Sequence, residues 1–233
     1  MTDVRAIDAA IRAAGTPERA VKEKAYLKST LRHHGTTVPE VRRVVRDYLR
    51  VHKNLAGAEA VALAEALWAE PVHERRLAAV LLLESAALRL GAGDVAVIER
   101  LLREARTWAL VDELAANVVG PMVERLPGMG RILDRWARDE DFWIRRSALL
   151  ALLVALRRGG GDFERFGRYA DAMLEEKEFF IRKAIGWVLR ETSKKRPELV
   201  ADWLAPREAR LSGVTRREAF KYLGSGSPSK AKR

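Results

Sequence analysis

A repeat in the sequence constrains the fold more than any other feature. The segment FWIRRSA at residues 142–148 returns as FFIRKAI at residues 179–185, a shift of 37 residues. The same register continues along the chain as six dipeptides with spacings of 33, 36, 34, 37 and 34 residues: Arg42-Arg43, Arg75-Arg76, Val111-Asp112, Arg145-Arg146, Arg182-Lys183 and Arg216-Arg217. Repeats of this length form stacks, because a single unit cannot bury its apolar face without its neighbours.

The residues between these dipeptides favour helix. Leu, Ala, Arg and Glu dominate, apolar residues recur at helical spacing, and runs of alternating β-branched residues are absent. Glycine and proline mark the turns at Gly15-Thr16-Pro17, Gly35 to Pro39, Gly91 to Gly93, Pro127-Gly128 and Gly159 to Gly161. The consensus patterns of tetratricopeptide and ankyrin repeats are missing. We therefore predict an all-α, HEAT-like helical repeat solenoid of about six two-helix units, curved around a basic concave face.

The predicted domain spans residues 1–222, and the small, polar and basic segment 223–233 is predicted to be a disordered tail. Lys and Arg outnumber Asp and Glu by 43 to 32, which gives a net charge of +11 and favours nucleic acid as the partner. The chain has no cysteine, which excludes disulfides, thiolate zinc sites and cysteine nucleophiles.

No segment of the sequence suggests a membrane partner. The N-terminus lacks the apolar core of a signal peptide, and the longest apolar run, Ala148 to Leu156, is half of the roughly 18 residues that a membrane span requires. We expect a cytoplasmic, nucleoid-associated monomer.

One member of the repeat breaks the basic pattern. The six dipeptides are here called the ridge dipeptides, and five of them are basic. Stacking of the repeats would place the basic pairs in a row that suits a phosphate backbone. A single basic pair would equally suit a solvated helix face, but five in register favour DNA. Val111-Asp112 is the exception. Phosphate would repel an acid at this position, so the exception requires a chemical explanation. Trp108 lies four residues before Asp112, so an indole and a carboxylate share one helix face.

A second tryptophan falls in the same register. Trp187 lies four residues after Lys183, and Arg146 is the ridge residue of the unit between Asp112 and Trp187. Aromatic rings beside a carboxylate describe a site for a cation, since a ring face attracts positive charge by about 0.5–2 kcal/mol. On DNA that cation is a purine alkylated at N3 or N7, or the oxocarbenium-like sugar formed when the base departs. A lone tryptophan is more often a core residue, and we assign four to the core: Trp68, Trp136, Trp143 and Trp203.

Metal and nucleotide sites have weaker support in the sequence. The acidic segment Asp139-Glu140-Asp141 is interpreted as the N-terminal cap of a helix. Segment 159–161 lacks the Lys and Ser or Thr of a phosphate-binding loop. The four histidines, His33, His34, His52 and His73, show no ligand spacing such as H-E-x-x-H, so we predict no metal and no cofactor.

The residues around Trp187 resemble a known family. Segment 177–191, KEFFIRKAIGWVLRE, is similar over almost its whole length to a motif of the AlkD-like DNA alkylation repair enzymes, which are HEAT-repeat DNA glycosylases. Fainter similarity runs from residue 18 to residue 220 and includes Tyr26-Leu27-Lys28. The chain departs from the family at Thr37-Val38-Pro39, where the family has a glutamine followed by Thr-Pro.

The resemblance implies hydrolysis of the N-glycosidic bond of cationic N3- and N7-alkylated purines in double-stranded DNA, leaving an abasic site. It implies that Asp112 is the catalytic aspartate, that Trp108 and Trp187 flank the lesion, and that Arg146 and Tyr26 contact DNA. Register and resemblance together predict DNA contacts from Tyr26, Lys28, Arg43, Arg76, Arg145, Arg146, Arg182, Lys183, Arg190 and Arg217.

Two other functions fit the same pattern. A non-catalytic helical repeat protein would bind bent, branched or damaged DNA through the ridge dipeptides alone, and it would not need Asp112 or the tryptophans. A protein-binding scaffold would use the helical faces instead, but the net charge of +11 disfavours it.

Overall fold

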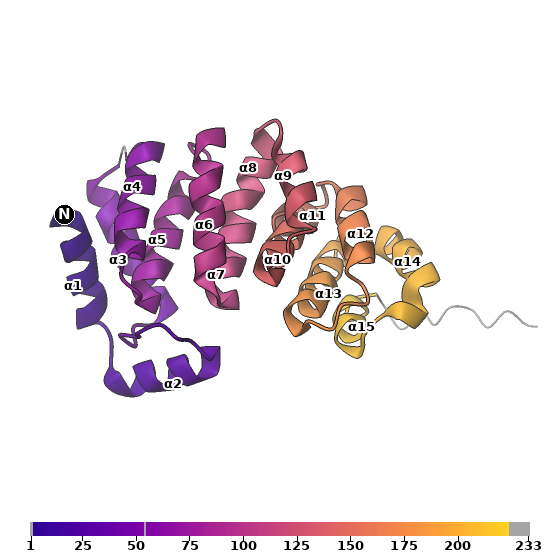
Figure 1. Ribbon diagram of the computed structural model, residues 1–233, viewed down its shortest axis with the longest axis horizontal. Helices are drawn as coiled ribbons and strands as arrows, with labels where there is room; N and C mark the ends of the chain where they lie inside the picture. The colour runs from indigo at the N-terminus through magenta and orange to yellow at the C-terminus, as the bar shows by residue number, and fades with distance from the viewer. Residues whose placement is uncertain (1, 54, 224–233) are drawn as a thin grey trace, which may run out of the picture. The chain divides into compact units, whose positions relative to one another are not determined.

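The computed structural model describes residues 2–53 and 55–223, and these residues form helices joined by short turns, with no strand among them (Figure 1). The all-α repeat fold predicted from the sequence is confirmed. In the predicted tail 223–233, residues 224–233 lie outside the described residues. Within the described ranges, no helix combines the length and apolarity needed to cross a membrane.

The chain divides into two compact units, residues 1–126 and 127–233, and the single domain 1–222 stays a prediction. Unit 1 contains α1 (Thr2–Ala13), α2 (Pro17–Leu27), α3 (Val38–Val51), α4 (Gly57–Trp68), α5 (His73–Ala86), α6 (Val95–Ala105), α7 (Trp108–Glu113) and α8 (Gly120–Arg125). Unit 2 contains α9 (Met129–Trp136), α10 (Phe142–Leu150), α11 (Leu153–Arg157), α12 (Phe163–Ala172), α13 (Phe179–Ser193), α14 (Pro197–Leu204) and α15 (Gly213–Ala219). Short 3-10 helices occupy Ala92–Asp94 and Ala205–Arg210, and a π-helix occupies Leu114–Val119.

The ridge dipeptides fall near the starts of equivalent helices, as the register predicts. They lie on α3, α5 and α7 in unit 1 and on α10, α13 and α15 in unit 2. Within unit 1, α5 packs against both α3 and α7, and within unit 2, α13 packs against both α10 and α15. The predicted turns separate these helices, and Asp141 caps α10 by accepting a 2.8 Å hydrogen bond from the Trp143 backbone N–H.

The tryptophan side chains divide largely as predicted. Trp68, Trp136 and Trp143 are buried in the core, whereas Trp108 and Trp187 are half-buried. Trp203, which we assigned to the core, is also half-buried: its ring contacts Phe166, and the Arg207 guanidinium lies 4.6 Å from the ring centroid. Half-burial therefore separates the two candidate site tryptophans from three of the other four.

Helix α2 is attached to unit 1 differently from the other helices. The structure describes α2 in full, and none of its residues is buried; it lies beside the stacked helices rather than among them (Figure 1). The loop that follows it is held by the buried carboxylate of Glu74, which accepts hydrogen bonds of 2.6–3.2 Å from the backbone N–H groups of His34, Gly35 and Thr36. Because no residue of α2 enters the core, the hydrogen bonds of this loop contribute to holding α2 in place.

Gly35 is essential to this attachment. Its φ of +78° lies in the left-handed region, and a Cβ there would lie 2.0 Å from the Thr16 carbonyl oxygen and 2.6 Å from the Ala20 nitrogen. Gly35→Ala should lower the free energy of unfolding by about 2–4 kcal/mol, because backbone atoms must move. Gly93→Ala is the matched control, since its Cβ would meet no atom within 4 Å. Urea unfolding measures both, and equal stabilities would contradict the prediction.

Candidate functional site

The candidate site in unit 1 is organised by α7. Leu110 and Val111 are fully buried, whereas Trp108 and Asp112 are half-buried. Trp108 is the first residue of the helix, and the α-helical segment continues past Asp112. The indole and the carboxylate therefore share the outward face of one helical turn, as their spacing predicts.

Tyr26 brings a second aromatic ring to this face. It lies at the end of α2, is 73% exposed, and meets the Trp108 ring edge-on at a centroid distance of 6.1 Å and an interplanar angle of 86°. Edge-to-face pairs of this kind contribute about 0.5–1.5 kcal/mol beyond burial. The structure thus joins Tyr26 to Trp108, two residues that the resemblance placed in the site separately.

Two strained residues flank this aromatic pair. Lys28 (φ 49°) and Arg106 (φ 46°) are the only non-glycine residues with positive φ among the described residues. Lys28 ends α2 two residues after Tyr26, and Arg106 ends α6 two residues before Trp108. Each left-handed residue costs about 1–2 kcal/mol, so the two turns that present the rings are maintained against an intrinsic preference.

The helix widens directly after Asp112. Residues Leu114–Val119 form a π-helix, and the Gly120 N–H donates to the Ala115 carbonyl, five residues back. Pro121 accounts for this widening, because it has no N–H and its ring would clash with the carbonyl of Asn117 in a regular α-helix. Single π-helical turns of this kind are often found at functional sites.

A charged network fixes the residue next to Asp112. The Arg42 guanidinium on α3 donates to Glu113 at 2.9 Å and to Glu84 at 3.2 Å, while Asn117 donates to the other Glu113 oxygen at 2.6 Å. Burial lowers the pKa of Arg42, but the two carboxylates outweigh that effect and raise it. Arg42 thus connects α3, α5 and α7, and this predicted ridge residue serves the frame of the site.

The candidate residues of unit 2 cluster on α13. Trp187 is half-buried on this helix, and both Lys183 and Arg190 form ion pairs with Glu218 of α15. Burial raises the pKa of Glu218, but its hydrogen bond to Lys183 and the charge of Arg190 outweigh that effect and lower it. Lys183 and Arg190 therefore flank Trp187 on one helix while connecting it to the next repeat.

Several arginines predicted to contact DNA donate hydrogen bonds within the protein. Arg145 donates to Glu176 at 2.8 and 3.0 Å, and Arg146, which is 2% exposed, donates to the Phe180 carbonyl. Arg76 donates to the Glu104 carbonyl at 2.8 Å. Arg182 likewise donates to the Glu176 carbonyl at 2.6 Å. The four exposed members of the predicted set are Tyr26, Lys28, Arg43 and Arg217.

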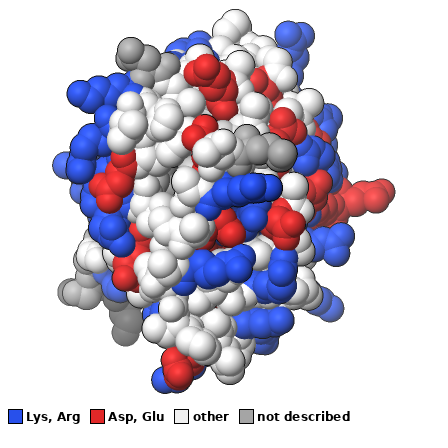
Figure 2. All heavy atoms as spheres, turned by 90° about the vertical axis from the view of Figure 1, so that its left-hand side faces the viewer, with Lys and Arg blue, Asp and Glu red and all other residues white. Residues whose placement is uncertain are grey.

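Acidic side chains neutralise part of the basic surface. Figure 2 shows basic and acidic side chains intermixed on the face it presents, rather than a continuous basic field. Arg43 pairs with Asp47 at 3.6 Å, and Arg216 pairs with Glu208. Ion pairs therefore neutralise some of the basic residues. The net charge of +11 attracts phosphate mainly through the exposed basic residues.

The sequence matches the family described as DNA alkylation repair enzyme over residues 7–223. The chain belongs to this family. A solved structure titled a predicted DNA alkylation repair enzyme from Enterococcus faecalis is 26% identical, with a TM-score of 0.79 over 91% of this chain and 97% of that one. AlkD2 from Streptococcus mutans is 19% identical, with a TM-score of 0.60 over 90% of this chain and all of that one, and supports the fold alone. A search of curated proteins gives no significant match.

Two features of the repair-family site were missed by sequence reasoning. The Arg42–Glu113–Asn117 network joins residues whose separation of up to 75 positions no motif reveals. The π-helix had a visible signal, because Pro121 interrupts an otherwise helical stretch. The family departure at Thr37-Val38-Pro39 lies at the start of α3, where Thr37 forms a capping box with Glu40 and Val38 is exposed.

The structure separates buried ridge arginines from exposed ones, and this separation is testable. Arg146→Ala should lower the free energy of unfolding by about 2 kcal/mol, because it removes the charged hydrogen bond that the buried Arg146 donates to the Phe180 carbonyl. Arg217→Ala, at an exposed position, should change it by less than about 0.5 kcal/mol. Urea unfolding of both variants checks this, and an Arg146→Ala protein as stable as the parent would contradict it.

Proposed function

We propose that this repair-family member is a monofunctional DNA glycosylase, which hydrolyses the N-glycosidic bond of cationic N3- and N7-alkylated purines. The observation that carries the proposal is the pairing of Asp112 with the half-buried Trp108 on α7, at the ridge position that is basic in the other five repeats. Family membership supports DNA as the partner, and double-stranded DNA containing alkylated purines is the proposed substrate.

A cationic base explains why the site needs no strong general acid. An alkylated purine leaves as a neutral base when the bond to the sugar C1′ breaks, and it takes the bonding electron pair with it. Water then forms the new bond at C1′ and loses its proton. The products are the free base and an abasic site, and no cofactor is required.

Asp112 supplies a negative charge that balances the positive charge left on the sugar when the base departs. Its carboxylate would stabilise the positive charge that develops on the sugar and would orient the attacking water. Each tenfold rate gain requires about 1.4 kcal/mol, so one well-placed carboxylate accounts for a few orders of magnitude. The neighbouring Glu113 is held by Arg42 and Asn117, and we assign it to the frame of the site rather than to the reaction.

The aromatic residues position the damaged nucleotide. Trp108, held by its edge contact with Tyr26, offers a ring face beside Asp112, and a ring face attracts a cationic base or sugar. Trp187, flanked by Lys183 and Arg190 on α13, is proposed to pack against the DNA backbone in the same reaction. The exposed residues Lys28 and Arg43 would hold phosphates.

The proposed setting follows from the substrate. We propose that the protein acts as a monomer in the cytoplasm, at the nucleoid that holds the chromosomal DNA. The single domain 1–222 and its basic concave face remain part of the proposal.

Release of a methylated base tests the proposed activity. Duplex DNA carrying N7-methylguanine should lose the base faster with the protein than without it. Asp112→Asn should reduce this release at least about 100-fold, because it removes the stabilising charge, while DNA affinity stays equal or rises. Glu65→Gln, a half-exposed acid on α4 paired with Arg100, is the control and should retain full activity. Release no faster than the spontaneous rate would leave a non-catalytic DNA-binding protein as the answer.

Salt dependence tests the basic contacts. If about six phosphates are neutralised, the logarithm of affinity should fall with the logarithm of salt with a slope of about −5. Arg217→Ala should reduce the magnitude of this slope by about 1 and weaken binding on all sequences. Arg168→Ala, an exposed arginine on α12 paired with Glu164, should leave the slope unchanged. A slope near zero for the parent would instead favour a protein-binding scaffold.

A further inference from the structure

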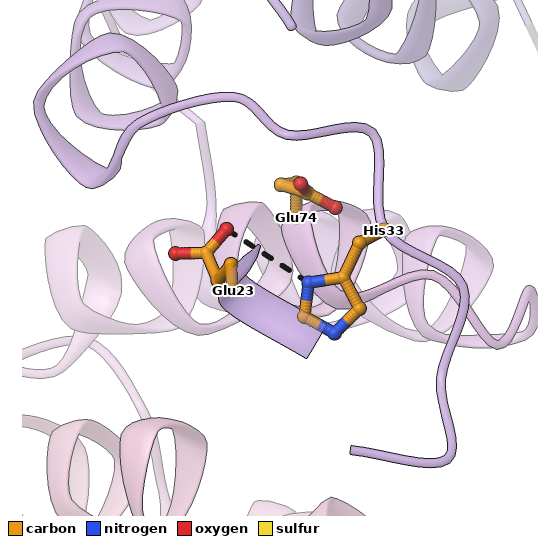
Figure 3. A group of neighbouring side chains, drawn as sticks. All are labelled: Glu23, His33 and Glu74. Atoms are coloured by element: carbon orange, nitrogen blue, oxygen red, sulfur yellow. Dashed lines mark ion pairs between the residues drawn. The ribbon is translucent and has the colours of Figure 1, made fainter. Parts of the chain in front are cut away.

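Three side chains from separate segments of unit 1 converge beneath α2. Glu23 lies on α2, His33 lies in the loop after it, and Glu74 lies on α5. The Nδ1 atom of His33 is 3.8 Å from the Oε2 atom of Glu23, and one nitrogen or carboxylate oxygen from each residue lies within 4.8 Å of the other two (Figure 3). One imidazole and two carboxylates therefore point into the same small volume.

Two of the three side chains, Glu23 and His33, contain buried polar atoms without hydrogen-bond partners. The side chain of His33 is 1% exposed and that of Glu23 is 12% exposed, while Glu74 is fully buried. Among the described residues, neither ring nitrogen of His33 has a hydrogen-bond partner, and neither does Oε2 of Glu23. An unsatisfied buried polar atom costs about 1–3 kcal/mol, so three in one cluster indicate a missing ligand.

Burial dominates the pKa values of Glu23 and His33. Burial, followed by the charge of Glu74, raises the pKa of Glu23 even though Arg19 bonds its other oxygen at 3.3 Å. Burial also lowers the pKa of His33, with smaller effects from Glu74, Lys24 and His34.

His73 adds to the same environment. Its ring stacks on that of His33 at a centroid distance of 4.7 Å and an angle of 9°. Burial, with a smaller effect of His33, lowers the pKa of His73 to about 4. The stacked His73 ring covers one face of the His33 imidazole.

We propose that Glu23, His33 and Glu74 form a binding site for a divalent transition-metal ion, with zinc as its representative. A set of one imidazole nitrogen and two carboxylate oxygens suits zinc and its neighbours, whereas calcium and magnesium prefer oxygen alone. Ligand atoms around tetrahedral zinc lie about 3.4 Å apart, given bonds of about 2.1 Å. A shift of Glu23, the most exposed of the three side chains, would shorten its distances to the other two ligands.

The surroundings hold two of the ligands ready. Three backbone N–H groups of the loop orient the Glu74 carboxylate, and Oε2 accepts only one of these bonds, at 3.0 Å from His34. Arg19 binds Oε1 of Glu23 and leaves Oε2 directed at His33. Outer contacts of this kind fix the orientation of metal ligands.

The metal would attach the helix that carries Tyr26. Helix α2 buries none of its own residues. A metal ion bound by Glu23 of α2, His33 of the loop and Glu74 of α5 would connect this helix to the rest of unit 1. Tyr26 follows Glu23 by one helical turn and contacts Trp108. The proposed site contradicts the sequence-based prediction of no metal. Its ligands would come from three segments, at spacings of 10 and 41 residues that no motif describes.

Zinc titration of the full chain without a histidine tag tests the proposal. After treatment with a chelator and its removal, calorimetry at neutral pH should show saturable binding of one zinc ion per chain. Glu23→Gln and His33→Asn should each weaken binding at least about 100-fold, since a lost ligand costs more than a lost outer contact. Glu18→Gln and His52→Asn, exposed on α2 and after α3, are the matched controls and should bind zinc as the parent does.

A structural readout accompanies the titration. Zinc should slow amide hydrogen exchange in residues 17–27 of the parent and of both controls, but not in Glu23→Gln. Absence of saturable one-to-one binding by the parent would overturn the proposal whether or not the variants fold. Equal affinities for the parent, Glu23→Gln and His33→Asn would overturn it as well. Neither measurement involves DNA, so failure here is distinct from failure of the proposed glycosylase activity.

Discussion

A two-helix unit cannot bury its own apolar face, and the rest of the structure depends on how that constraint is met. Each ridge helix packs against the ridge helix of the neighbouring repeat within its unit. Several basic side chains at the starts of these helices also form hydrogen bonds between repeats. Arg145 and Arg146 reach Glu176 and the Phe180 carbonyl in the following repeat, and Arg76 reaches the Glu104 carbonyl. A repeated basic position is thus partly an outcome of stacking, independent of any partner.

Asp112 is the ridge residue that cannot form such a bond between repeats. A ridge arginine can donate to the next repeat, but a carboxylate at that position cannot make that bond. The segment around it compensates in other ways. The adjacent Glu113 receives Arg42 and Asn117, and the helix widens into a π-helical turn ahead of Pro121. The strained residues Lys28 and Arg106 sit on either side of the Tyr26–Trp108 contact. Strain and irregular helix concentrate where the repeat is broken, as expected when function rather than stability determines the local structure.

The fold was predictable because its cause is periodic. The 33–37-residue spacing, the turn residues and the helical register of Trp108 and Asp112 all follow from neighbours along the chain. Contacts between repeats were not predictable in the same way. Sequence alone does not show that Arg146 is buried while Arg217 is exposed, since both belong to the same pattern. The half-burial of Trp203, whose ring lies under the Arg207 guanidinium, was not predictable from the sequence either.

Helix α2 shows where periodicity stops being a guide. It follows none of the ridge register, buries no residue of its own, and yet delivers Tyr26 to Trp108. Its position depends on polar groups brought together from three segments: Glu74 beneath the loop, Gly35 at a close backbone contact, and Glu23 facing His33. Polar attachment is weaker per contact than apolar burial but more specific in geometry, because each hydrogen bond or metal bond requires one orientation. A helix that must hold an exposed aromatic ring at one angle, while contributing nothing to the core, is therefore best held by such groups.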